Sequence, residues 1–122
     1  MKKLLIFLCF AWIIPQIDWQ IYLDMFPNIR ELTKEESASK NFPMGNPKAY
    51  NPKDSDGRPK YGLLQFGKWE FYTWAKLAGL EDAVIWNPIH QIIVARWAED
   101  NNMLNRWGPF KRLVKSGRIL LE

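Results

Sequence analysis

A glutamate at the end of a short amphipathic segment is the residue of this sequence best placed to do chemistry. The segment FPNIRELTKEES predicts a helix, and within it Ile29, Leu32 and Glu36 follow the i, i+3, i+7 spacing of one helical face. At about 100° per residue, Glu36 projects within roughly 10° of the middle of that face. Glu35 points roughly 90° away from it. We therefore expect Glu36 on the apolar face, in the last turn of its helix.

A carboxyl in that position is expected to hold a proton near neutral pH. Burial among apolar side chains disfavours the charged form and raises the pKa of a glutamate. The negative end of the helix dipole acts in the same direction. A protonated carboxyl is what a general acid needs to protonate a leaving glycosidic oxygen. The alternative is that the helix frays here, which leaves Glu36 solvated and without a catalytic role.

The sequence contains little that indicates a metal site or a phosphate-binding site. It contains one His and one Cys, so a zinc site is not expected. The stretch DSDG is like the start of a calcium loop, but the later positions of that loop fall on Arg58, Pro59 and Gln65 instead of oxygen ligands, Gly and Glu. There is no glycine-rich phosphate loop. We expect neither a metal nor a cofactor.

The N-terminus is typical of an export segment. Two lysines precede an apolar run over residues 4–14, which is short for a membrane span and suits a signal peptide. We assign residues 1–19 to a signal peptide or N-terminal membrane anchor and expect a secreted or cell-envelope protein. No small-x-small cleavage site follows, so an uncleaved anchor and a buried N-terminal helix stay open as alternatives. Cys9 lies in this run, which leaves residues 20–122 without a disulfide.

Composition predicts one globular domain over residues 20–122. The chain has 122 residues, of which 48% are hydrophobic and 25% are charged. Seven Trp are more than so short a chain ordinarily needs; such rings fill cores, and exposed ones can hold sugars. The net charge of +4 favours an anionic partner, but no basic cluster longer than a pair indicates nucleic acid. We expect a monomer.

Further helices and one polar loop complete the predicted architecture. Helices are expected over 67–79, over 87–101 with Asn87 as N-cap, and within 109–121. The apolar stripe expected on the second of these consists of Ile89, Ile92, Ile93 and Trp97. Residues 38–60 contain four Pro and two Gly, which predicts a loop with a short hairpin around Asp56-Gly57. The fold class is therefore mainly α, with one polar excursion.

The stretch GNPKAYNPKDSDGRPKYGLLQF resembles the active-site segment of the lysozyme-like superfamily, especially its bacterial and phage soluble lytic transglycosylase-type domains. In that family a Glu-Ser pair ends a helix, and an Asn-Pro-x-Ala segment leads to a motif like Tyr-Gly-Leu-Leu-Gln-Phe. The later IWNPIHQIIVARW resembles the helix that follows the substrate cleft. The resemblance covers residues 45–107 and implies an α+β lysozyme-like fold.

The resemblance also implies a substrate and a set of site residues. The substrate is the glycan strand of peptidoglycan, cleaved between MurNAc and GlcNAc, and Glu36 is the catalytic acid. The residues that it implies for substrate binding are Tyr61, Gly62, Leu63 and Gln65. Gly62 would let the backbone approach the sugar closely. For Gln65 the alternative is a hydrogen bond that closes the turn onto its own loop.

One departure from the family pattern leaves two readings open. Family members have about two residues between the Glu-Ser pair and the Asn-Pro, whereas here eight residues separate Ser37 from Asn46. An alignment without a gap places Phe42, which cannot donate a proton, at the catalytic position. Either the extra residues form a tolerated loop and Glu36 is the acid, or the domain is a degenerate module that binds peptidoglycan or serves as an envelope scaffold.

The count of carboxylates favours a transglycosylase over a hydrolase. Animal lysozymes carry a second carboxylate immediately before the Tyr-Gly, where this chain has Lys60. The nearest acids, Asp54 and Asp56, lie in the loop and reach the site only if the loop folds back. One acid suits a lytic transglycosylase, in which Glu36 protonates the leaving oxygen and then deprotonates the 6-hydroxyl of the muramic acid. The product of that reaction is a 1,6-anhydro sugar.

Overall fold

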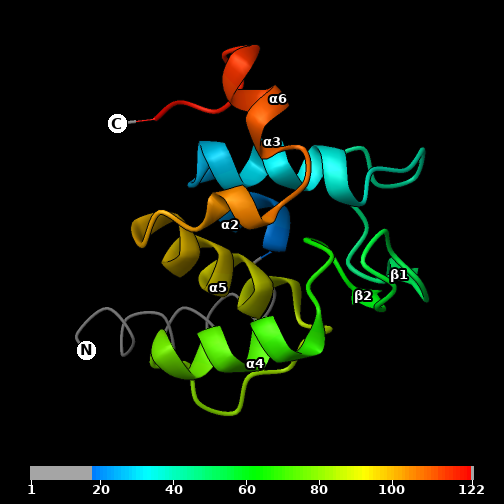
Figure 1. Cartoon of the computed structure of the whole chain (residues 1–122), viewed down its shortest axis with the longest axis vertical. Helices are drawn as coiled ribbons and strands as arrows, with labels where there is room; N and C mark the ends of the chain where they lie inside the picture. Colours follow the sequence, from blue (N-terminus) through cyan, green and yellow to red (C-terminus); the bar gives the residue numbers. More distant parts are fainter. Residues whose placement is uncertain (1–17, 122) are drawn as a thin grey trace.

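Helices dominate residues 18–121, the part of the chain that the computed structural model describes (Figure 1). The elements are α2 (Trp19–Asp24), α3 (Pro27–Glu36), β1 (Tyr50–Asn51), β2 (Lys60–Tyr61), α4 (Lys68–Leu77), α5 (Pro88–Asp100), the 3₁₀ helix η1 (Leu104–Arg106) and α6 (Phe110–Lys115). The mainly α class and the four predicted helices, which are α3 to α6, are confirmed. Within residues 18–121, no helix combines the length and the apolar character needed to cross a membrane.

The described residues begin with a short helix, α2, that the sequence patterns did not predict. Asp18 caps α2 by accepting a hydrogen bond from the backbone N–H of Gln20, and Leu23 of α2 is fully buried. The predicted boundary after residue 19 therefore falls inside the first turn of α2. The rest of the predicted export segment, residues 1–17, lies outside the described residues.

Helix α5 is central, and its neighbours are α4, α2 and α3 (Figure 1). Asn87 caps it as predicted, accepting hydrogen bonds from the backbone N–H groups of Ile89 and His90. The predicted stripe is only partly confirmed, because Ile92 is fully buried whereas Ile89, Ile93 and Trp97 are half-buried. The buried residues of α5 are Gln91, Ile92, Val94, Ala95 and Ala98. Because helices cover α5 on more than one side, small and polar residues are buried where an amphipathic surface helix would expose them.

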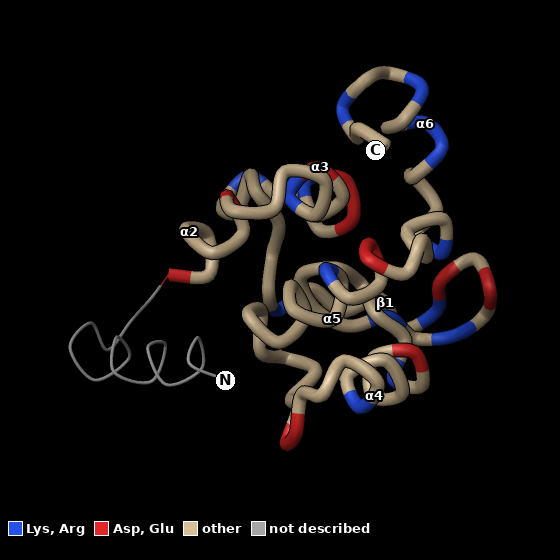
Figure 2. Tube along the Cα trace, turned by 90° about the vertical axis from the view of Figure 1, so that its left-hand side faces the viewer, with Lys and Arg blue, Asp and Glu red and all other residues tan. Residues whose placement is uncertain are grey.

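The predicted hairpin is confirmed as a two-stranded antiparallel sheet beside the helices (Figure 1). Tyr50 pairs with Tyr61, and Asn51 pairs with Lys60. The connecting loop turns at Gly57, whose φ of +82° is a conformation that glycine adopts readily. The loop carries charges of both signs, whereas Lys and Arg are prominent along α6 (Figure 2).

Much of the aromatic content is core. Phe66 lies at the centre of an aromatic cluster, with its ring centroid 5.5 Å from that of Phe71, 6.1 Å from that of Trp74 and 5.2 Å from that of Trp107. The indole Nε1 of Trp107 donates a 2.8 Å hydrogen bond to the backbone carbonyl of Leu64. The segment between α5 and α6 is thereby fixed against the turn that follows β2.

Candidate functional site

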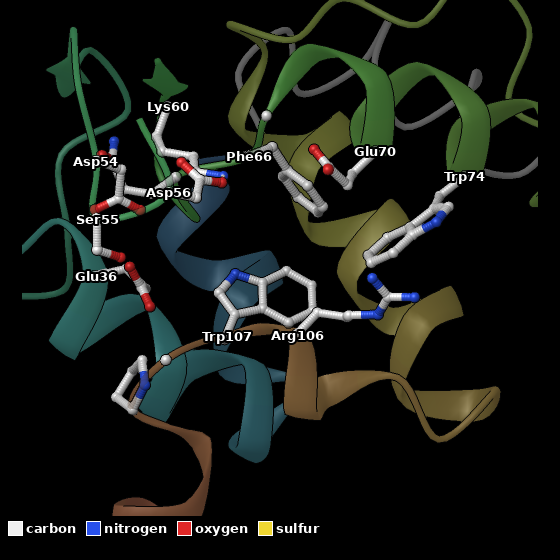
Figure 3. Close-up of a pocket in the computed structure, with 14 residues that line it drawn as sticks. Glu36, Asp54, Ser55, Asp56, Lys60, Phe66, Glu70, Trp74, Arg106 and Trp107 are labelled. Atoms are coloured by element: carbon white, nitrogen blue, oxygen red, sulfur yellow. The ribbon is translucent and has the colours of Figure 1, made fainter. Parts of the chain in front are cut away.

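A cavity of about 500 Å³ opens between the end of α3, the hairpin loop, the start of α4 and the segment after η1 (Figure 3). This volume lies within the usual range of small-molecule sites. The residues that line it are Glu36, Asp54, Ser55, Asp56, Lys60, Gln65, Phe66, Gly67, Glu70, Trp74, Arg106, Trp107, Gly108 and Pro109. Phe66 and Trp107 lie in its middle, with Glu36 and the loop acids towards one end and Trp74 and Arg106 towards the other (Figure 3).

Glu36 is the last residue of α3, and the structure places it in the wall of this cavity. Ile29 and Leu32 of the same helical face are fully buried, as the spacing predicts. Burial raises the pKa of the Glu36 carboxyl to about 7, and the charge of Asp54 adds to the increase, while Lys60 acts against it. The carboxyl is therefore protonated in a large share of molecules at neutral pH.

The neighbouring glutamates of α3 have a different environment. Glu35 forms ion pairs with Arg112, at 3.0 Å, and with Arg118 of the C-terminal segment. Glu31 forms ion pairs with Lys34, at 3.1 Å, and with Arg118, at 2.9 Å. The side chains of Glu31 and Glu35 are thus paired with cations, and neither lines the main cavity. The direction that helical spacing predicts for Glu36 relative to Glu35 is consistent with this division.

Ser37 joins the three sequence segments that the motif comprises. Its buried hydroxyl donates a 2.6 Å hydrogen bond to the carbonyl of Leu63 and accepts a 3.0 Å bond from the backbone N–H of Asn46. The Glu-Ser pair, the Asn-Pro pair and the Tyr-Gly-Leu-Leu-Gln-Phe turn therefore meet at one side chain. This contact fixes the backbone next to Glu36.

The eight residues between Ser37 and Asn46 form a local loop. The backbone N–H groups of Phe42 and Gly45 donate to the carbonyls of Ser39 and Phe42, respectively. Gly45 packs so closely that a Cβ there would lie 2.5 Å from Thr33 Cγ2, and its φ is +115°. Phe42 does not line the cavity. The extra length is accommodated by this turn, with Glu36 at the cavity and Phe42 away from it.

The turn from Tyr61 to Phe66 is organised around a buried amide. Gln91 of α5 is fully buried; its Oε1 accepts a 2.7 Å hydrogen bond from the N–H of Leu64, and its Nε2 donates to the carbonyls of Tyr61, at 2.9 Å, and Ile85, at 2.6 Å. Sequence reasoning missed this residue. An amide within an otherwise apolar helical segment was the available signal, because a buried polar side chain needs partners of this kind.

Only one of the four residues expected to bind substrate lines the cavity, and that residue is Gln65. Leu63 is fully buried. A Cβ at Gly62 would lie 2.3 Å from Nε2 of Gln91, so a side chain of the protein itself closely approaches this glycine. Tyr61 packs on Tyr50 and Trp86, away from the lining residues.

Gln65 itself has the local role that was the alternative. Its Nε2 donates a 2.8 Å hydrogen bond to the carbonyl of Gly62 and a weaker 3.3 Å bond to that of Ala49. Its φ of +53° is in the left-handed region, where the tight turn holds it. Since Gln65 also lines the cavity, its side chain can close the turn and contact a ligand at the same time.

The loop acids fold back to the cavity. Asp54 and Asp56 both line it, together with Glu36. Asp56 forms a 2.8 Å ion pair with Lys60, and this hydrogen bond, with a second from the N–H of Arg58, lowers the pKa of Asp56. Asp54 accepts a long, 3.4 Å hydrogen bond from Asn51. Asp54 is therefore the loop carboxylate that no cation neutralises directly among residues 18–121.

Within the described range, no three His, Cys, Asp or Glu side chains gather closely enough to hold a metal ion. Comparisons with protein-family models, with curated proteins and with solved structures find no match for this chain.

Proposed function

We propose that this chain is a lysozyme-like, lytic transglycosylase-type enzyme that cleaves the MurNAc–GlcNAc bond of peptidoglycan, with Glu36 as its general acid and base. The observation that carries the proposal is the position of Glu36. A carboxyl with a pKa of about 7 lines a cavity of about 500 Å³ at the point where Ser37 joins the motif segments. A general acid works best when its pKa lies near the working pH.

The reaction proceeds in two steps that return Glu36 to its starting state. Protonated Glu36 donates its proton to the glycosidic oxygen as the bond from that oxygen to C1 of the muramic acid breaks. The carbonyl oxygen of the substrate's own N-acetyl group bonds to C1 and compensates its positive charge. The Glu36 carboxylate then removes the proton of the 6-hydroxyl, whose oxygen displaces the acetamide oxygen from C1. The products are a 1,6-anhydro sugar and a free 4-hydroxyl, and no water is consumed.

The geometry of the 38–45 loop supports an active enzyme over a degenerate module. A degenerate site would have Phe42 at the catalytic position, but Phe42 lies outside the cavity lining. Glu36 lines the cavity, and the adjacent Ser37 makes two hydrogen bonds that hold this end of α3 in place. The insertion thus alters the loop without removing the acid from the cavity.

A second candidate is a hydrolase, and the position of Asp54 favours it. Asp54 lines the same cavity, and its charge contributes to the raised pKa of Glu36. In an inverting glycosidase a second carboxylate near the general acid activates water, and Asp54 is a carboxylate of the same cavity wall that could take this role. Hydrolysis leaves a reducing end in place of the anhydro sugar, so the product distinguishes the two reactions.

The test compares matched variants of the full-length chain on purified peptidoglycan. Glu36→Gln should reduce the release of soluble fragments at least about a hundredfold, the usual contribution of a general acid. Glu35→Gln is the matched control, because Glu35 is adjacent in sequence and paired with arginines, and it should retain activity. Asp54→Asn should leave transglycosylation nearly unchanged and abolish hydrolysis. If Glu35→Gln is the inactive variant, or if the folded parent releases nothing, the proposal is wrong.

The pH profile gives a second check on the role of Glu36. A general acid must be protonated before it can act, and the carboxyl of Glu36 loses its proton as the pH rises through about 7. We expect kcat/KM to fall on the alkaline side with an apparent pKa near that value. A profile that stays flat from pH 6 to about 9 would contradict the assignment.

A further inference from the structure

Three aromatic rings from separate segments meet on the surface of the hairpin. The ring centroid of Tyr50 in β1 lies 5.3 Å from that of Tyr61 in β2. The ring of Trp86, in the loop before α5, lies 5.5 Å from Tyr61 and 6.5 Å from Tyr50, and is nearly perpendicular to Tyr61 at 87°. We call these three residues the hairpin aromatic cluster.

The hairpin separates this cluster from the cavity. Tyr50 is paired with Tyr61 across the strands, and Asn51 is paired with Lys60. Successive side chains of a strand point to opposite faces, so the tyrosine pair lies on one face and Lys60 on the other. Lys60 lines the cavity and binds Asp56 there, whereas no member of the hairpin aromatic cluster lines it. The cluster is therefore a second surface, on the opposite face of the hairpin from the cavity.

The cluster is open to solvent, and its polar edges are available. Tyr50 is 55% exposed and Trp86 is 44% exposed. Among residues 18–121, neither phenolic hydroxyl nor the indole N–H of Trp86 makes a hydrogen bond. The ammonium group of Lys68 lies 5.2 Å from the centre of the Tyr61 ring and makes no ion pair within the same range. Flat apolar faces are thus bordered by donors, acceptors and one positive charge.

We propose that the hairpin aromatic cluster binds an N-acetylated sugar of a glycan strand outside the cavity. This inference rests on the proposed function for the identity of the glycan. The C–H face of a pyranose ring can pack on an exposed aromatic face, and its hydroxyl and acetamide groups can bond to the polar edges of the cluster. Lys68 suits the carboxylates that peptidoglycan carries on its peptide stems.

The size of the surface favours a sugar over a protein. A whole aromatic side chain covers about 150–250 Å², so Tyr50 and Trp86 each offer roughly 100 Å². Together with the part-exposed Tyr61, the surface amounts to about a quarter to a third of the roughly 800 Å² that each partner contributes to a stable protein interface. It is comparable with one face of a mono- or disaccharide. A second attachment would keep the enzyme on an insoluble strand between cleavage events, because it raises the local concentration of substrate.

The experiment measures binding to insoluble peptidoglycan by co-sedimentation, with the full-length chain carrying Glu36→Gln so that the substrate stays intact. In this background, Tyr50→Ala and Trp86→Ala should each weaken binding about three- to tenfold. The matched control is Trp69→Ala, since Trp69 is a 65% exposed tryptophan on α4 outside the cluster, and it should change binding less than about twofold. Tyr50→Ser repeats the removal of the ring with a polar side chain that suits this largely exposed position, and circular dichroism of each variant checks its fold.

Three results would overturn the inference. One is a parent that does not sediment with peptidoglycan. Another is binding by the cluster variants as tight as that of Trp69→Ala. The third is a parent that self-associates in analytical ultracentrifugation and loses this property with Trp86→Ala, which would make a second copy the occupant. Cleavage assays on the Glu36-containing chain separate this inference from the proposed function. If the chain has no activity but its binding depends on Trp86, the sugar surface is supported and the enzyme is refuted. If the chain is active but its binding does not depend on Trp86, the enzyme is supported and the sugar surface is refuted.

Discussion

Replacing Glu36 by glutamine should stabilise the protein at alkaline pH, although it removes the proposed catalytic group. The pKa of Glu36 is about 7 in the folded chain, against 4.5 for an ordinary glutamate. Each pKa unit corresponds to about 1.4 kcal/mol, so holding the ionised carboxyl in the cavity wall costs roughly 3 kcal/mol of folding free energy. Glutamine has nearly the same shape and cannot ionise, and the variant therefore does not carry this cost.

The sign and the pH window follow from the two pKa values. Below pH 4.5 the carboxyl is protonated in both the folded and the unfolded chain, so the parent has no penalty. Between 4.5 and about 7 the unfolded chain releases the proton while the folded chain keeps it, and the stability of the parent falls as the pH rises. Above about 7 the full penalty is present. The advantage of Glu36→Gln over the parent should therefore grow by roughly 3 kcal/mol from pH 4 to about 8.

Urea unfolding followed by tryptophan fluorescence at about pH 4, 6 and 8 measures this difference. Any contribution of the glutamine amide itself is the same at each pH and cancels. Glu35→Gln is the control: it removes solvent-accessible ion pairs to Arg112 and Arg118, and should cost less than about 1 kcal/mol with no gain at high pH. A difference between parent and Glu36→Gln that stays constant from pH 4 to about 8 would refute the assignment of a buried, proton-bearing carboxyl.

Three further substitutions, with Gly57→Ala as a control for one of them, test how the site is held together, each by urea unfolding. Ser37→Ala should lower the free energy of unfolding by about 2 kcal/mol, because it leaves a buried carbonyl and an N–H without their partner. It should also lower activity by loosening the end of α3. Unchanged stability would contradict the role of Ser37 in joining the three segments. Gly45→Ala should lower the free energy of unfolding by at least about 3 kcal/mol, since its Cβ would overlap with Thr33. Gly57 also has a positive φ but open space around its Cβ position, so Gly57→Ala should cost only about 1 kcal/mol. Equal effects of the two substitutions would show that the close contact at Gly45 does not matter. Gln91→Leu should cost about 3–5 kcal/mol, because three backbone groups lose their only side-chain partner, and a cost below about 1 kcal/mol would contradict its place in the turn.

Local patterns predict the site where its chemistry depends on one helix. The spacing of Ile29, Leu32 and Glu36 is enough to place the carboxyl on the buried face, because the geometry of α3 is regular over that distance. The cap at Asn87 and the turn at Gly57 are likewise local, and both are observed. These features depend on residues a few positions apart, for which backbone geometry is nearly fixed.

The sequence patterns did not predict the features that depend on long-range packing. Gln91 is buried where the turn after β2 presents the N–H of Leu64 and the carbonyl of Tyr61 to α5, about 30 residues later in the chain. The stripe predicted on α5 is only partly correct for a related reason: the helix is covered on more than one side. The return of Asp54 to the cavity depends on the path of a loop that no periodicity describes. The division of the hairpin into a cavity face and an aromatic face requires the strand register.

The most direct test of Glu36 as the proton donor is the mass of the fragments released from purified peptidoglycan by the full-length chain. Transglycosylation predicts 1,6-anhydro muropeptides, lighter by one water than the reducing products of hydrolysis, and their loss in Glu36→Gln but not in Glu35→Gln. Anhydro products that persist in Glu36→Gln would contradict the central claim, and reducing products from the parent would transfer the second catalytic role to Asp54.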